Sequence, residues 1–204
     1  MAKQGDLFAN PDSSLSVTAS RAAGDIEALP LLRHQLEDWR HRLASFQHPL
    51  FAGHPTLGQQ GLLFAAAGDA TSQQAATLNP LELKPQPLSF WRWPAAPHQG
   101  AALYFVIDLA SSGASPLLLY VGETGRADHR WKGEHDCKRY LAAYSEALQK
   151  VKLPLQLSIR FWLDVPEAIK PRRALEQALI QRWQPPFNKE TRERWATPFT
   201  AELD

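Results

Sequence analysis

Hydrophobic positions along the chain follow two different patterns. Between Leu31 and Phe46, large apolar residues recur at alternating steps of four and three, which places them on one side of an α-helix. Ala102–Asp108 and Leu117–Gly122 are instead continuous β-prone runs, separated by a loop that contains glycine. We therefore predict a helix in the first stretch and a β-hairpin in the second. The helix either packs on the core with a solvated basic face, or contacts a DNA backbone or a second subunit.

Further elements follow the hairpin. A short helix that carries Arg130 and a helix over residues 136–149 precede a third strand, Leu155–Leu163, and a last helix covers Ala174–Trp183. Pro171 either starts this last helix or kinks a longer one. The predicted fold class is α+β, with a small antiparallel three-stranded sheet flanked by helices in the order β-β-α-α-β-α.

The chain divides by composition into four parts. Residues 1–12 are predicted to be a flexible tail, 13–99 a helical and proline-rich extension, 100–190 the main domain and 191–204 a second tail. Within the extension, residues 65–77 are predicted to be a loop. Leu88–Trp93 is predicted to be an edge strand or a segment packed over the core, and its two tryptophans either pack there or stack on unpaired bases.

Composition narrows the class of protein. The 204 residues are 44% hydrophobic, and no apolar run reaches the length of a membrane span. The first residues lack a signal pattern and Cys137 is the single cysteine, so we expect a cytoplasmic protein without an internal disulfide. The net charge is +1, with 15 Lys and Arg against 12 Asp and Glu after residue 119. This mild basic bias leaves nucleic-acid binding open.

Residues 102–188 contain the side chains from which a hydrolytic site could be built. Two phenols, a guanidinium, an imidazole, a helix-borne carboxylate and an amide occur here: Tyr104, Tyr120, Arg130, His135, Glu176 and Asn188. Together they could hold a phosphodiester, bind one hard divalent cation and move a proton. These residues also have other interpretations, because the tyrosines could be ordinary strand residues and Arg130 could pair with Glu134 on its own helix.

The order and spacing of these motifs resemble the GIY-YIG nuclease superfamily. The first signature stands as Ala102-Leu103-Tyr104, with alanine where the family usually has glycine, and the second stands as Tyr120-Val121-Gly122. Arg130 lies ten residues beyond Tyr120, as the family's helix arginine does. His135 is similar to a histidine of the homing endonucleases but sits one residue late. The family's closing pattern is matched by Glu176, Ile180, Pro185 and Asn188.

The resemblance implies a DNA endonuclease that depends on Mg²⁺ or Mn²⁺. It implies that Glu176 binds the metal and that Tyr104 is the general base. A phenol titrates near 10, so this role requires nearby positive charge to lower its pKa. Tyr120 and Arg130 would position water and phosphate, and Asn188 would anchor the site. The basic residues expected to contact DNA are Arg126, Lys132, Lys138 and Arg139.

A short motif near the N-terminus suggests a partner. The stretch from Gln4 to Phe8 (Gln-Gly-Asp-Leu-Phe) resembles the peptide with which bacterial polymerases and repair proteins dock on the DNA sliding clamp. Leu7 and Phe8 would enter an apolar pocket, while Gln4 and Asp6 would make polar contacts. Short matches also arise by chance, so an incidental tail is the alternative.

Three functional hypotheses remain at this stage. The first is a structure-selective endonuclease of DNA repair or recombination, associated with the nucleoid and recruited by the clamp. The second is a type II restriction-like endonuclease, and the third is a non-catalytic DNA-binding or clamp-associated adaptor. Cleavage of two strands by one site per chain would favour a homodimer.

Overall fold

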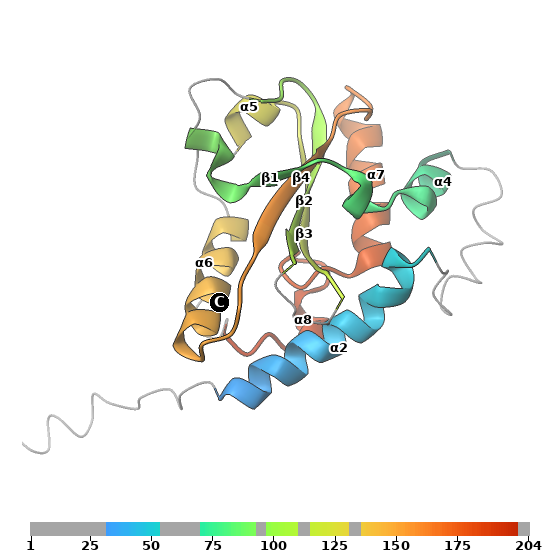
Figure 1. Cartoon of the computed structure of the whole chain (residues 1–204). Coiled ribbons are helices and arrows are strands. Elements are labelled where there is room, and N and C mark those ends of the chain that lie inside the picture. The colour runs from blue at the N-terminus through green and yellow to red at the C-terminus, as the bar shows by residue number, and fades with distance from the viewer. Residues whose placement is uncertain (1–31, 54–69, 93–96, 110–114, 131–135, 200–204) are drawn as a thin grey trace, which may run out of the picture. The chain divides into compact units, whose positions relative to one another are not determined.

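An antiparallel sheet organises the part of the chain that the computed structural model describes, residues 32–53, 70–92, 97–109, 115–130 and 136–199 (Figure 1). These residues belong to one compact unit, Leu31–Asp204. The sheet has four strands in the order β1-β4-β2-β3, and β2 lies between its two hydrogen-bonded neighbours. The strands are β1 (Pro85–Pro87), β2 (Ala102–Asp108), β3 (Leu117–Thr124) and β4 (Leu157–Trp162).

The α+β class and the antiparallel sheet are confirmed, but the prediction of three strands is wrong. The additional strand, β1, pairs with β4 and places Gln86 opposite Ile159. Its sequence, Pro-Gln-Pro, does not look like a strand, because proline has no N–H to donate to a ladder. An edge position tolerates proline, since one side of such a strand has no partner strand. The sheet therefore includes residues from before position 100.

The helices agree with the predicted order but differ in detail. They are α2 (Arg33–Phe51), α4 (Ala70–Thr77), α5 (Ala127–Arg130), α6 (Asp136–Lys150), α7 (Ile169–Trp183) and α8 (Arg192–Trp195), with 3₁₀ turns η3 (Pro80–Glu82) and η4 (Leu88–Arg92). The prediction of a loop over residues 65–77 is wrong where α4 forms. The edge-strand interpretation of residues 88–93 is also wrong, because η4 lies there with Phe90 packed on Phe161. α7 begins early enough that Pro171 falls in its first turn, where proline costs no hydrogen bond.

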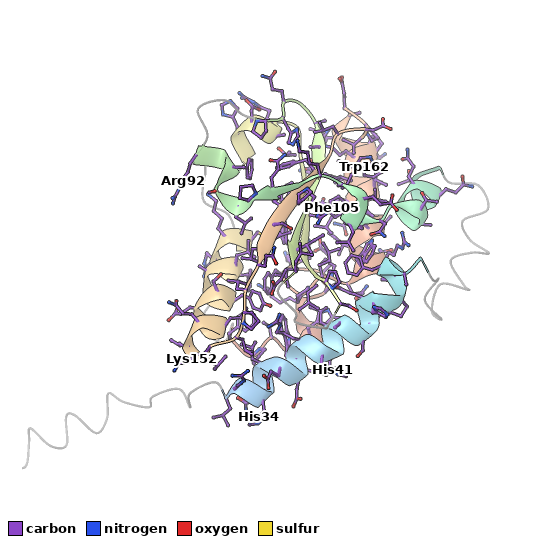
Figure 2. The ribbon with its side chains drawn as sticks, in the orientation of Figure 1. His34, His41, Arg92, Phe105, Lys152 and Trp162 are labelled. Carbon is purple, nitrogen blue, oxygen red and sulfur yellow. The ribbon has the colours of Figure 1, made fainter. Side chains whose placement is uncertain are left out.

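Both faces of the sheet are buried, which explains why every residue of β2 is buried and why the strand is hydrophobic as far as Asp108, its last residue. Tyr104 and Val106 contribute to one core together with residues of α2 and α6. Leu103 and Phe105 contribute to the other core together with residues of α4 and α7. Figure 1 shows α6 and α7 on opposite sides of the sheet, and Phe105 is labelled in Figure 2.

A β-bulge in β3 sets the direction of one side chain that matters for function. Leu118 pairs with Ile107 and Tyr120 pairs with Val106, so the register shifts and Leu119 has no direct partner on β2. Side chains alternate between the two faces of a strand, and one extra residue reverses the alternation beyond it. Because of this bulge, Tyr120 lies on the same face as Tyr104.

The outer edge of β3 is closed by groups from distant parts of the chain. The Gln47 amide bonds both the N–H and the C=O of Leu118, at 2.8 and 2.9 Å. The Phe187 N–H donates to the Leu119 carbonyl at 3.1 Å. Asn188 and Glu176 bond the next residues along the same edge. In this way α2, α7 and the segment after α7 are all attached to one strand.

Within the described ranges, no helix is both long enough and apolar enough to cross a membrane.

Candidate active site

The two tyrosines of the signatures stack on one face of the sheet. Their ring centroids lie 5.9 Å apart with an interplanar angle of 27°. Tyr104 has 0% exposure, whereas Tyr120 is partly exposed. Tyr120 is therefore the tyrosine that a substrate can reach in this conformation, and Tyr104 supports it from beneath.

Gly122 is required for this stacking. It lies directly opposite Tyr104 in the β2–β3 register. A Cβ atom at Gly122 would lie 2.4 Å from both Cζ and Oη of Tyr104 and 2.7 Å from Cε1 of Tyr120. These separations are far below van der Waals contact, so any larger residue would displace a tyrosine. The glycine of the second signature thus has a steric role that the structure makes explicit.

Ala102, the departure from the family pattern, occupies the start of β2. It is buried and pairs with Thr124. Its methyl group is therefore accommodated within the core that contains Tyr104 and residues of α2 and α6.

Glu176 bonds the end of β3 at Glu123, the residue that follows Gly122. It lies on α7, and its Oε1 accepts the Glu123 N–H at 2.9 Å. The side chain is half-buried. Glu123 follows Gly122, so Glu176 and the stacked tyrosines contact neighbouring residues of β3, with α7 on the sheet face opposite the tyrosines. Carboxylate oxygen suits a hard cation that keeps most of its water, so Glu176 fits the Mg²⁺ that the resemblance implies.

Asn188 anchors the chain after α7 to β3. Its Oδ1 accepts the Val121 N–H at 2.9 Å and its Nδ2 donates to the Val121 carbonyl at 2.7 Å. The residue is 4% exposed. Both ends of the amide therefore bond the main chain next to Gly122, and the contribution of Asn188 to the site is to hold this strand.

Several predicted site residues fall outside the described structure. Of Arg130 only the main chain is described, at the end of α5. Lys132 and His135 lie in the range 131–135, which is outside the described residues, as are Gln4, Asp6, Leu7 and Phe8 of the clamp-like motif. Of the remaining predicted DNA contacts, Arg126 and Arg139 are exposed and Lys138 is half-buried. Arg126 lies just before α5, and the other two lie on the first turn of α6.

Two features at the site were missed by the sequence analysis. Arg172, one turn before Glu176 on α7, is 2% exposed and donates from Nε to Glu123 Oε2 at 2.8 Å. His98 packs on Phe161, with ring centroids 5.0 Å apart, and Phe161 in turn packs on Tyr104. The i, i+4 spacing of Arg172 and Glu176 was a usable signal, since it places both side chains on one helix face.

The imidazole of His98 is fixed by β1. Its Nε2 is hydrogen-bonded to the side-chain nitrogen of Gln86, which is buried. Burial, and secondarily the positive charge of Lys84, lower the pKa of His98 below its ordinary value. The neutral form is thereby favoured near the tyrosines.

The described residues contain no group of three or more His, Cys, Asp or Glu side chains that could hold a metal ion. A site built on the single carboxylate of Glu176 does not require such a group. A surface cavity of about 500 Å³ lies elsewhere, between α2 and residues 196–198. Its lining includes Asp38, Trp39 and Arg42 but neither tyrosine nor Glu176. The cavity is thus separate from the residues that suggest chemistry.

No family model, curated protein or solved structure matches the chain.

Proposed function

We propose that this protein is a Mg²⁺-dependent DNA endonuclease of the GIY-YIG type, which cuts branched or damaged DNA in repair or recombination. The observation that supports the proposal is that the stacked tyrosines and Glu176 contact neighbouring residues of β3, Gly122 and Glu123. Two stacked tyrosines lie on one side of this strand segment, and the Glu176 carboxylate is bonded to its main chain. Hydrolysis of a phosphodiester needs an activated water and neutralisation of charge on the phosphate, which a carboxylate-bound cation and hydrogen-bond donors can supply.

In the proposed reaction, Glu176 would hold the divalent cation, which would supply charge neutralisation and a more acidic water. The hydroxyl group of Tyr120 donates a hydrogen bond to a phosphate oxygen, since this tyrosine is the more exposed of the two. Arg130, whose side chain lies outside the described structure, would neutralise the phosphate in the role that the resemblance implies. Asn188 holds Val121 and so keeps the strand that carries Tyr120 in place.

Because Tyr104 is buried, two different roles in the reaction have to be distinguished for it. If Tyr104 is the general base, the groups that cover its ring must move when DNA binds. If Tyr104 only supports Tyr120, its hydroxyl group is dispensable. Tyr104→Phe keeps the ring and removes the hydroxyl, so loss of cleavage would assign the base role, while retained cleavage would assign the supporting role. Tyr120→Phe is the matched variant, and we expect it to reduce cleavage by about 100-fold or more.

The proposal is tested with the full-length protein, Mg²⁺ and labelled Holliday junction, flap, splayed-arm, single-stranded and duplex DNA. We expect cleavage of a branched DNA that disappears in Glu176→Ala. Cutting of plain duplex at one sequence would instead establish the restriction-like alternative. Binding of DNA without cleavage under Mg²⁺ or Mn²⁺ would overturn the nuclease.

The complete burial of Tyr104 favours one second candidate, a non-catalytic DNA-binding adaptor that keeps the nuclease-like arrangement. Such a protein would bind branched DNA equally well as wild type and as Glu176→Ala. Recruitment by the sliding clamp is compatible with either function. A clamp pull-down with the Leu7→Ala/Phe8→Ala variant tests it, and unchanged capture would exclude the motif.

A further inference from the structure

Two residues of α7, one turn apart, hold the same residue of β3 in different ways. Arg172 donates from Nε to the Glu123 side chain at 2.8 Å, and Glu176 accepts the Glu123 main-chain N–H at 2.9 Å. Arg173 adds a second contact, from Nε to the other Glu123 carboxylate oxygen at 3.3 Å. Glu123 is thus fixed to α7 through both its main chain and its side chain.

Arg172 is itself fixed at its other end. Its Nη1 donates to the carbonyl groups of Pro166 and Glu167, at 3.1 and 2.6 Å, in the segment that precedes α7. Its Nη2 lies close to the turn after β3, because a Cβ atom at Gly125 would lie 3.4 Å from it. The planar guanidinium therefore joins the start of α7 to the end of β3.

An arginine at this position breaks two local rules of helix stability. A positive charge in the first turns of a helix opposes the helix dipole. The desolvation of a buried ion pair also offsets much of its attraction. The N-cap residue, Ala168, makes no side-chain hydrogen bond that would compensate. Breaks of local rules of this kind concentrate at functional sites.

The geometry points to Arg172 as a positioning residue for the Glu176 carboxylate. Arg172 and Glu123 hold the first turns of α7 against the end of β3, where the Glu176 carboxylate bonds the Glu123 main chain. The same contacts engage both oxygens of Glu123 with arginines. This inference rests on the proposed nuclease function.

The first test measures cation binding without DNA. Binding of Mn²⁺ to the full-length protein is followed by the spectroscopic signal of the free ion, for wild type, Arg172→Met and Lys170→Met. Partners that orient a metal ligand typically contribute about 10- to 100-fold in affinity, so we expect a loss in that range for Arg172→Met. Lys170→Met is the control, because it removes one positive charge from the exposed side of the same helical turn.

The second test separates positioning from a merely structural role. Cleavage by Arg172→Met should need about 10-fold or more Mg²⁺ for half-maximal rate, with most of the rate recovered at saturating Mg²⁺. Arg172→Lys should restore only part of the wild-type Mg²⁺ dependence. An ammonium group cannot bridge Glu123 and the two carbonyl groups as a planar guanidinium does. If Arg172→Met does not fold, Glu123→Gln replaces it, since it removes the charge partner and keeps the main-chain bond to Glu176.

The outcomes distinguish the two proposals. A folded Arg172→Met protein with wild-type Mn²⁺ affinity and Mg²⁺ dependence would overturn the positioning role and leave the nuclease intact. A wild-type protein that neither binds Mn²⁺ through Glu176 nor cleaves any DNA would overturn the proposed function itself.

Discussion

Two buried pairs of an acid and an arginine lie at opposite ends of the β2–β3 hairpin. Asp108 and Arg40 lie at the end where Asp108 pairs with Leu117, and Glu123 and Arg172 lie at the other end, where Glu123 pairs with Leu103. The carboxylate of Asp108 has 0% exposure, whereas that of Glu123 has 16%. The hairpin is therefore anchored at one end in the core and at the other end beside the candidate site.

The partners of the two carboxylates differ in kind. Asp108 Oδ2 accepts the Tyr144 hydroxyl at 2.8 Å and contacts Arg40 at 3.4 Å, and Oδ1 accepts the Gln156 N–H at 3.0 Å. These contacts join α2, α6 and the segment before β4, so they serve the fold. Glu123 joins only β3 and α7, next to the proposed metal ligand. Similar chemistry thus serves stability at one end of the hairpin and, in our proposal, site geometry at the other.

Removal of Asp108 should have the largest effect on stability. Asp108→Ala leaves the guanidinium of Arg40 and the hydroxyl of Tyr144 without the carboxylate, and we expect a loss of about 3–5 kcal/mol in the free energy of unfolding. Urea unfolding measures it. Glu123→Ala is the comparison and should cost less, because Arg172 keeps the carbonyl groups of Pro166 and Glu167. Equal losses would show that the two pairs do not differ as we describe.

A methyl group at Gly122, at the end of the hairpin that carries the candidate site, should have the next largest effect on stability. Gly122→Ala forces Tyr104 or Tyr120 to shift, and overpacking of this kind costs about 1–3 kcal/mol. Gly125→Ala is the matched control, since its Cβ would only reach ordinary contact with Arg172. Urea unfolding and the rate of DNA cleavage should both fall for Gly122→Ala. Unchanged values would mean that the tyrosines do not need this close approach.

Replacing Tyr144, which bonds Asp108, should have a smaller effect on stability. Tyr144→Phe removes one hydrogen bond to a carboxylate, which is worth about 1.5 kcal/mol or more. Burial, with the negative charge of Asp108, raises the pKa of Tyr144 well above its usual value near 10. The folded protein therefore keeps a proton that the unfolded chain releases, and stability falls as the pH rises above about 10. Urea unfolding between pH 8 and 11 should show a flatter loss for Tyr144→Phe, and an identical slope would contradict this.

His98 should give the smallest effect, near the site. Its pKa is lowered by burial and then by Lys84, so folding disfavours the protonated ring. Stability should therefore decrease as the pH falls through about 6.5, the usual value for histidine. His98→Gln should reduce this decrease in thermal unfolding between pH 5 and 8. His34→Gln, at an exposed position on α2 (Figure 2), is the control and should retain the wild-type decrease.

The sequence was most informative where hydrophobic runs are long and regular. β2 could be predicted to the residue from its apolar run, and α6 to within one residue. β1 could not be predicted, because a Pro-Gln-Pro strand exists only through pairing with β4. The bulge at Leu119 could not be predicted either, since it depends on the register against β2. Because the sequence does not show the bulge, the spacing of Tyr104 and Tyr120 does not reveal that their side chains lie on the same face of the sheet.

The candidate site was only partly predictable for a similar reason. The sequence indicated Glu176 and Asn188 as chemically relevant residues, but not that both bond the main chain of β3. In the sequence, a buried arginine cannot be told from any other basic residue on a helix, so Arg172 stood out only once its three partners were located.

The closed edge of β3 has a consequence for the newly synthesised chain. An open strand edge is a template for pairing with another chain. The edge of β3 is covered by Gln47, Glu176 and Asn188, and two of these follow the strand by more than fifty residues. A nascent chain that has left the ribosome only as far as α6 therefore exposes this edge. We expect aggregation, and the need for a chaperone, to be greatest at that stage and to end when Asn188 emerges.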